Sequence, residues 1–151
     1  MKILIRTAAC CLILLYAAAA ARAQGWRGVV PLHSTRADVE RLFGLPNPQD
    51  GFYDFKNESV EFRYSDGPCV NGWDVPRDTV IDIRVVPKQD LRLSKLPFGV
   101  GGFKKVKDEE LPGFYSYSSE EKGITVKTAD GLVVDIIYSW TKKDSHRLCP
   151  R

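Results

Sequence analysis

Two aspartates form the best acid pair that this chain offers for general acid–base chemistry. Asp82 and Asp135 occupy matching positions in two stretches rich in valine and isoleucine, residues 79–86 and 132–140. Two carboxylates that converge in a cleft can act as acid and base in a hydrolase. Strand alternation would instead place Asp82 and Asp135 on a solvated face, or pair them with cations such as Arg84 and Lys127. We favour this second interpretation and keep a small hydrolase using the two aspartates as the alternative.

The other reactive side chains form no catalytic or metal-binding motif. His33 and His146 are the two histidines, too few to suggest a zinc site beside scattered acids. The chain has no Gly-x-Ser-x-Gly elbow, and the glycines at 99–102 neither follow a clear strand nor open a helix. We therefore predict a protein that is not an enzyme and that uses no metal and no cofactor.

Residues 1–23 have the pattern of an export signal. Lys2 and Arg6 precede an apolar stretch at 8–21, and Ala21-Arg22-Ala23 fits a cleavage site. The apolar stretch is shorter than the ~20 residues that span a membrane. We expect a periplasmic or extracellular protein with no transmembrane segment once the signal is removed.

Cys69 and Cys149 are the only cysteines beyond the signal. In an oxidising compartment two cysteines most simply form a disulfide with each other. Free or metal-binding thiols are the alternative, but further ligands for a metal are lacking. A bridge closing about 80 residues would contribute up to roughly 4.5 kcal/mol through chain entropy.

The net charge of +3 arises entirely from the signal. Lys2, Arg6 and Arg22 are three of the 22 basic residues, so 19 basic residues remain against 19 acidic ones. Nucleic-acid binding needs a net basic surface that displaces counterions. The balance of charge argues against a nucleic-acid partner.

The rest of the chain reads as two similar halves within one domain, residues 24–151. The pseudo-repeats cover about 32–86 and 91–140, and residues 68–78 are an insertion that the second half lacks. Strand patterning occurs in six stretches: 52–55, 59–65, 79–86, 114–117, 123–127 and 132–140. We therefore expect an α+β fold, a duplicated three-stranded antiparallel meander with one main helix and a single disulfide.

The expected helix lies before the first meander. Ser34 or Thr35 can cap its start, and Gly44 suits its end. The corresponding stretch of the second half, residues 90–110, contains one proline and three glycines. There we expect no regular helix beyond a turn or two around residues 103–107.

The insertion holds the best candidates for a protein contact. Trp73, Asp74 and Arg77 follow an Asn-Gly turn and the predicted disulfide anchor. Tryptophan and arginine are enriched among the residues that dominate protein interfaces. The alternative is that Trp73 folds back and covers the core, as large aromatic residues near a disulfide often do.

The segment before the first meander resembles a known family. Residues 31–46 are similar to the start of the BamE-like (SmpA/OmlA) domain, with the matching residues Thr35, Val39, Phe43, Gly44 and Pro46. A tandem pair of such units also resembles the β-lactamase-inhibitor protein fold. A lipid-attachment motif is missing, and the insertion lies outside the family pattern. The resemblance implies an exported, non-enzymatic domain that contacts or scaffolds another envelope or secreted protein, with inhibition of a secreted enzyme as a further alternative.

Overall fold

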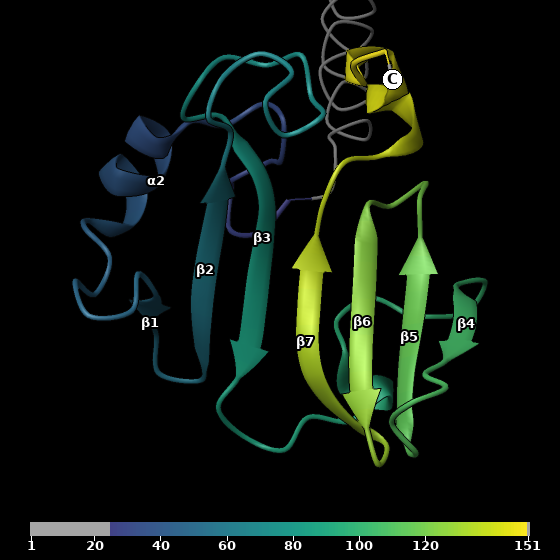
Figure 1. The fold of residues 1–151 in the computed structure, drawn as a ribbon. Coiled ribbons are helices and arrows are strands. Elements are labelled where there is room, and N and C mark those ends of the chain that lie inside the picture. The colour runs from purple at the N-terminus through teal and green to yellow at the C-terminus, as the bar shows by residue number, and fades with distance from the viewer. Residues whose placement is uncertain (1–24, 151) are drawn as a thin grey trace, which may run out of the picture.

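The computed structural model describes residues 25–150, which form one seven-stranded antiparallel sheet with a short helix beside it (Figure 1). The predicted signal at 1–23 lies outside the described residues. The strand order is β1-β2-β3-β7-β6-β5-β4. The strands are β1 (Tyr53–Asp54), β2 (Glu58–Tyr64), β3 (Val80–Pro87), β4 (Lys104–Lys107), β5 (Phe114–Ser119), β6 (Ile124–Ala129) and β7 (Leu132–Tyr138). The helix is α2 (Arg36–Phe43), and two 3₁₀ turns are η2 (Leu93–Lys95) and η3 (Lys142–Arg147).

The prediction of a duplicated three-stranded meander with one main helix is wrong. β3 pairs directly with β7, so the strands belong to a single sheet in which α2 is a minor eight-residue element. Residues 104–107, where a helical turn was expected, form the edge strand β4 against β5. Sheet pairing supplies the backbone hydrogen bonds of this segment, whereas an isolated helical turn would leave most of them unmade.

Helix α2 begins and ends where its capping residues indicate. Thr35 is the N-cap: its hydroxyl accepts from the Asp38 N–H at 3.3 Å, and Asp38 Oδ2 accepts from the Thr35 N–H at 3.0 Å. The Thr35 N–H and then Arg41 lower the pKa of Asp38 to about 2. Gly44 ends the helix with φ of 79°, a conformation that costs little without a Cβ. The predicted cap and stop are confirmed.

The core lies on one face of the sheet. Val60, Ile83 and Val126 are fully buried there at the centre of β2, β3 and β6. An aromatic cluster around Trp26 and helix α2 covers one half of this face. Residues 88–103 cover the other half, passing behind β7 and β6 in Figure 1. This irregular segment packs apolar side chains on the core where a second helix would otherwise be needed, namely Leu91, Leu93, Leu96, Phe98, Val100 and Phe103.

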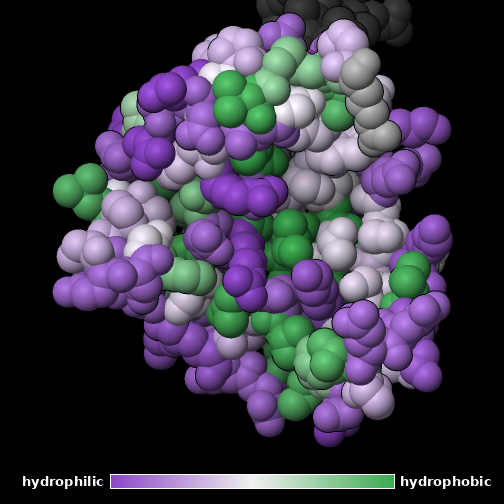
Figure 2. Space-filling model, viewed as in Figure 1, coloured by the Kyte–Doolittle hydropathy of each residue, from purple (hydrophilic) through white to green (hydrophobic). Residues whose placement is uncertain are grey.

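The opposite face of the sheet is open and carries charges. Figure 2, drawn from this side, shows many hydrophilic residues. Arg63 forms an ion pair with Asp82 across β2 and β3, and Arg84 forms one with Asp135 across β3 and β7. Alternation of apolar and polar residues along each strand separates the core from this face.

The C-terminal turn η3 is tied to the start of the described chain by a buried carboxylate. Asp144 is 5% exposed, and its Oδ2 accepts from the Thr141 N–H at 2.9 Å and the Thr141 hydroxyl at 2.8 Å. Its Oδ1 lies 3.1 Å from His33 Nε2. Burial alone would raise the pKa of Asp144, but the bonds from Thr141 and His33 outweigh it and lower the pKa.

Acid should therefore weaken the domain through Asp144. A carboxyl whose pKa is lowered by folding stabilises the native state above its unfolded pKa, near 3.9, and loses that contribution as the pH falls through the lower folded pKa. We expect Asp144→Asn to be less stable at pH 7 and to show a shallower fall in melting temperature below about pH 4. Thermal melts of both proteins from pH 7 to pH 2.5 measure this, and parallel curves would contradict it.

Candidate functional site

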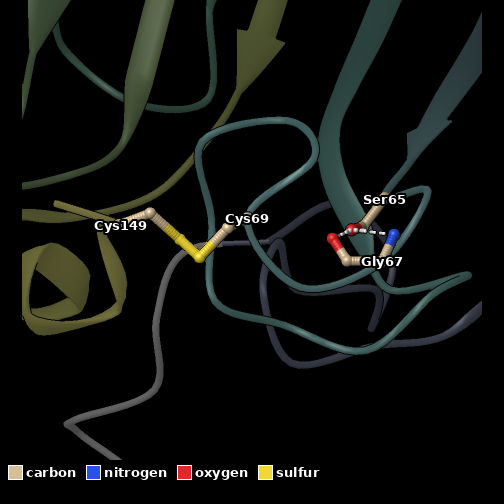
Figure 3. The surroundings of a disulfide bond; sticks show 4 residues. All are labelled: Ser65, Gly67, Cys69 and Cys149. Atoms are coloured by element: carbon tan, nitrogen blue, oxygen red, sulfur yellow. Dashed lines mark hydrogen bonds between the residues drawn. A yellow bond between two sulfur atoms is a disulfide. The ribbon is translucent and has the colours of Figure 1, made fainter. Parts of the chain in front are cut away.

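The insertion, residues 68–78, is fastened to the C-terminal segment at one end of the sheet. The predicted disulfide is present: Cys69 and Cys149 are joined, with Cα atoms 5.6 Å apart (Figure 3). The Asp74 N–H donates to the Arg147 carbonyl at 2.8 Å, and the Cys149 N–H donates to the Gly72 carbonyl at 3.1 Å. A covalent bond and backbone hydrogen bonds therefore hold this loop as a rigid part of the fold.

The start of the loop is fixed by a buried serine. Ser65 Oγ donates to the Gly67 carbonyl at 3.0 Å and accepts from the Gly67 N–H at 3.1 Å (Figure 3). Gly67 has φ of 138°, a backbone conformation that side chains with a Cβ rarely adopt. Arg77, at the far end of the loop, donates from Nε to the Asp66 carbonyl at 3.1 Å. Hydrogen bonds thus hold the backbone at both ends of the loop.

Trp73 of this loop contacts Trp140, which follows β7. The rings of Trp73 and Trp140 have centroids 5.4 Å apart and planes inclined at 50°. Both rings pack against a small second core made of Leu32, Val75 and Ile81, yet both stay partly exposed. Part of the Trp73 side chain therefore covers this second core, as the alternative prediction stated, and the rest of it is exposed.

The exposed parts of both indoles line a cleft of about 520 Å³. The floor and walls combine apolar and polar side chains, and the lining residues are Arg63, Tyr64, Asp66, Asn71, Trp73, Ile81, Asp82, Ser139 and Trp140. Small-molecule sites commonly have volumes of about 300–1,000 Å³ and combine aromatic walls with a few placed polar groups. The cleft has the size of such a site, and its lining is more polar than most because five of its nine residues are polar.

Trp140 is held in the cleft by a close backbone approach. Immediately after β7, the Ser139 N–H donates to the Gly123 carbonyl at 2.7 Å. A Cβ at Gly123 would clash with the carbonyl oxygens of Ser139 and Trp140. The glycine therefore lets the turn before β6 lie against the segment that carries Trp140.

The charges of the cleft are nearly balanced. Arg63 pairs with Asp82, and burial raises the pKa of Asp82 by more than Arg63 lowers it. Asp66 has its side chain at the exposed rim, where Asn71 Oδ1 accepts from the Asp66 N–H at 2.8 Å. One guanidinium thus stands beside two carboxylates in this cleft.

The predicted contact residues of the insertion lie in different places. Trp73 lines the cleft, whereas Asp74 and Arg77 are exposed and outside its lining. Arg77 nevertheless lies next to the rim because its guanidinium is bonded to the Asp66 carbonyl.

The structure does not bring Asp82 and Asp135 together. Extending the β3–β7 register places Asp82 opposite Ser139, four residues along β7 from Asp135, or roughly 14 Å. Carboxylate pairs in glycosidases are about 5–10 Å apart. Arg84 binds Asp135 through two bonds, at 2.8 and 3.2 Å, in line with the expected cation partner, although Asp135 is buried rather than solvated. The two aspartates therefore do not form an acid–base pair.

The histidines serve local structure. His33 contacts Asp144, and His146 Nδ1 lies 2.9 Å from the Lys143 carbonyl. Within residues 25–150, no group of three or more His, Cys, Asp or Glu side chains is arranged to hold a metal ion. In the same part of the chain, no helix has the length and apolar character needed to span a bilayer.

Sequence reasoning found one wall of the cleft and missed the others. Trp73 stood out because it lies in the insertion, but Trp140 looked like the last residue of a strand. Arg63 and Asp66 gave no signal beyond a charged strand residue and an Asp-Gly turn.

Comparisons with protein-family models, with curated proteins and with solved structures find no match. The BamE-like resemblance stays a prediction.

Proposed function

We propose that this protein is an exported, non-catalytic binding module of the cell envelope or extracellular space, and that its binding site is the Trp73–Trp140 cleft. One observation carries this proposal: two partly exposed indoles with ring centroids 5.4 Å apart line a cleft of about 520 Å³, and one of them belongs to a disulfide-anchored loop. A rigid site loses little conformational entropy when a ligand binds. The export signal pattern and the disulfide support the compartment.

Binding fits the cleft better than catalysis because no enclosed, unpaired base lines it. Arg63 holds Asp82 in an ion pair, and Asp66 lies at the solvent-exposed rim, where water hydrates its carboxylate. A general base needs a free carboxylate or imidazole within reach of the substrate proton. Neither histidine lines this cleft.

A protein contact is the second candidate function, favoured by apolar groups beside the cleft. Val70 in the loop is 66% exposed, and Leu148, which forms a β-bridge with Trp73, is 47% exposed. Exposed apolar residues that cluster at one site mark interaction surfaces. A scaffolding partner or a secreted enzyme inhibited by this protein would contact them together with the cleft.

Replacing Trp73 by alanine should abolish capture of the natural ligand. Oxidised protein comprising residues 24–151 is immobilised and exposed to an envelope extract of the source cell, beside Trp73→Ala and the remote control Leu42→Ala, whose leucine is 45% exposed on α2. Wild type and Leu42→Ala should retain the same component, and Trp73→Ala at least about tenfold less, because interface tryptophans commonly contribute 2 kcal/mol or more. Circular dichroism establishes that the variants are folded. Equal retention by all three would overturn the proposal.

A further inference from the structure

The two indoles offer a surface suited to a flat, weakly polar ring. Aromatic faces carry partial negative charge and attract weakly positive hydrogens. A pyranose ring has one face of C–H bonds with that character. Trp73 and Trp140 both line the cleft and are both partly exposed, so their indoles are available to contact such a ring.

The polar groups of the cleft have hydrogen-bonding capacity to spare. The ion pair of Arg63 Nη2 with Asp82 Oδ2 leaves the other carboxylate oxygen and further guanidinium N–H groups. The Asn71 amide nitrogen makes only a 3.5 Å contact with Asp66 Oδ2. Donors and acceptors thus stand side by side at the indole walls. Hydroxyl groups suit this arrangement because each one donates and accepts.

The charge of the cleft selects among ligands of this kind. Arg63 and, at the rim, Arg77 contribute two positive charges, and Asp66 and Asp82 contribute two negative charges. An anionic sugar would lose the hydration of its carboxylate without gaining net attraction, because Asp82 already neutralises Arg63 and the charges of the site balance. A neutral sugar meets no such penalty.

We infer that the cleft binds a neutral pyranose residue of a glycan, an inference that rests on the proposed function and names the ligand class of the same site. The cleft volume of about 520 Å³ suits one or two sugar rings. The open sheet face next to it leaves room for the rest of a chain (Figure 2). The glycan would come from the envelope or from extracellular material, as the export pattern requires.

Titration with soluble oligosaccharides tests this inference. Protein comprising residues 24–151 is titrated up to 10 mM with cellotriose, with the trimer of N-acetylglucosamine and with trigalacturonate, and calorimetry and tryptophan fluorescence are recorded. We expect at least one neutral trimer to bind and shift the emission, and trigalacturonate to bind more weakly because its carboxylates lose hydration without net attraction. Asp66→Ala should weaken the neutral ligand about tenfold, the typical effect of losing a hydrogen bond to a charged group. Leu42→Ala should bind as the wild type does.

Three results would overturn the inference, and a fourth would overturn the proposed function on which it rests. If no neutral trimer binds while Trp73→Ala still abolishes capture from the envelope extract, the cleft is a binding site for something other than a sugar, and the proposed function survives. If trigalacturonate binds as tightly as the neutral trimers, the charge argument is wrong. If the captured component binds equally well after glycosidase treatment, the partner is a protein surface. If capture from the extract does not depend on Trp73, the proposed function itself fails.

Discussion

Replacing Cys69 and Cys149 by serine should lower the free energy of unfolding by about 3–4.5 kcal/mol. The bridge joins residues 80 positions apart, so its removal frees a long loop in the unfolded chain. In the native state the bridge fastens the insertion to the C-terminal segment, outside the sheet ladders. The sheet itself should therefore form in the variant. For a domain of this size the melting temperature should fall by about 10 °C or more.

Urea unfolding of the oxidised wild type, the reduced wild type and the double serine variant measures this effect. The reduced wild type and the serine variant should unfold at similar urea concentrations, since both lack the bridge. The variant should also lose the cleft-dependent binding, because Trp73 is held against Trp140 from the anchored loop. A loss smaller than about 1 kcal/mol, or unchanged binding, would show that the noncovalent contacts of the loop hold it unaided.

Local signals accounted for the elements that the sequence predicted. Thr35 and Gly44 mark the ends of α2 because each acts on the helix terminus next to it in the chain: Thr35 caps the first turn, and Gly44 adopts the positive φ that ends the helix. The alternation Val60, Phe62, Tyr64 predicted β2 because side chains of a strand point to opposite faces in turn. The cysteine pairing followed from their number and compartment alone. Each of these inferences needs only neighbouring residues or a count.

The sheet as a whole depends on pairings that no local pattern encodes. The contact of β3 with β7 joins residues about fifty positions apart, and similar halves suggested two meanders where the structure has one sheet. β4 was missed because Lys104–Lys107 has a single apolar residue, Val106, and lies on an edge where charged side chains are tolerated. Its strand state is set by pairing with β5. The pattern of apolar residues along the chain therefore could not predict which strands pair or in what register.

The cleft could be predicted only in part for a related reason. It assembles side chains from β2, the turn after it, the insertion, the start of β3 and the two residues that follow β7. The insertion looked unusual and drew attention to Trp73. Arg63 and Trp140 belong to ordinary strand patterns, and they reach the cleft because the central pairing of β3 and β7 brings both halves of the sheet to the same end. A site made across a sheet cannot be read from one segment.

The aromatic cluster has its centre at Trp26, which no sequence pattern singles out. Trp26 lies three residues after the predicted cleavage site and is 6% exposed. Its ring centroid lies 5.3 Å from that of Phe43, 5.2 Å from that of Phe55 and 5.8 Å from that of Phe62. Trp26 therefore joins helix α2 to the first strands of the sheet.

Trp26→Ala should accordingly lower the free energy of unfolding by about 3–5 kcal/mol, the usual cost of truncating a buried tryptophan. Phe43, Phe55 and Phe62 would line the resulting cavity. They belong to three different segments of the chain, so they cannot move together to fill it. Urea unfolding of Trp26→Ala, Trp26→Phe and Leu42→Ala measures the effect, with Trp26→Phe expected between wild type and alanine. Leu42→Ala removes a 45% exposed leucine near the same cluster and should cost below about 1 kcal/mol. Equal stability of Trp26→Ala and Leu42→Ala would mean that the N-terminal segment is not part of the core, and that the aromatic cluster is held by α2 and β2 alone.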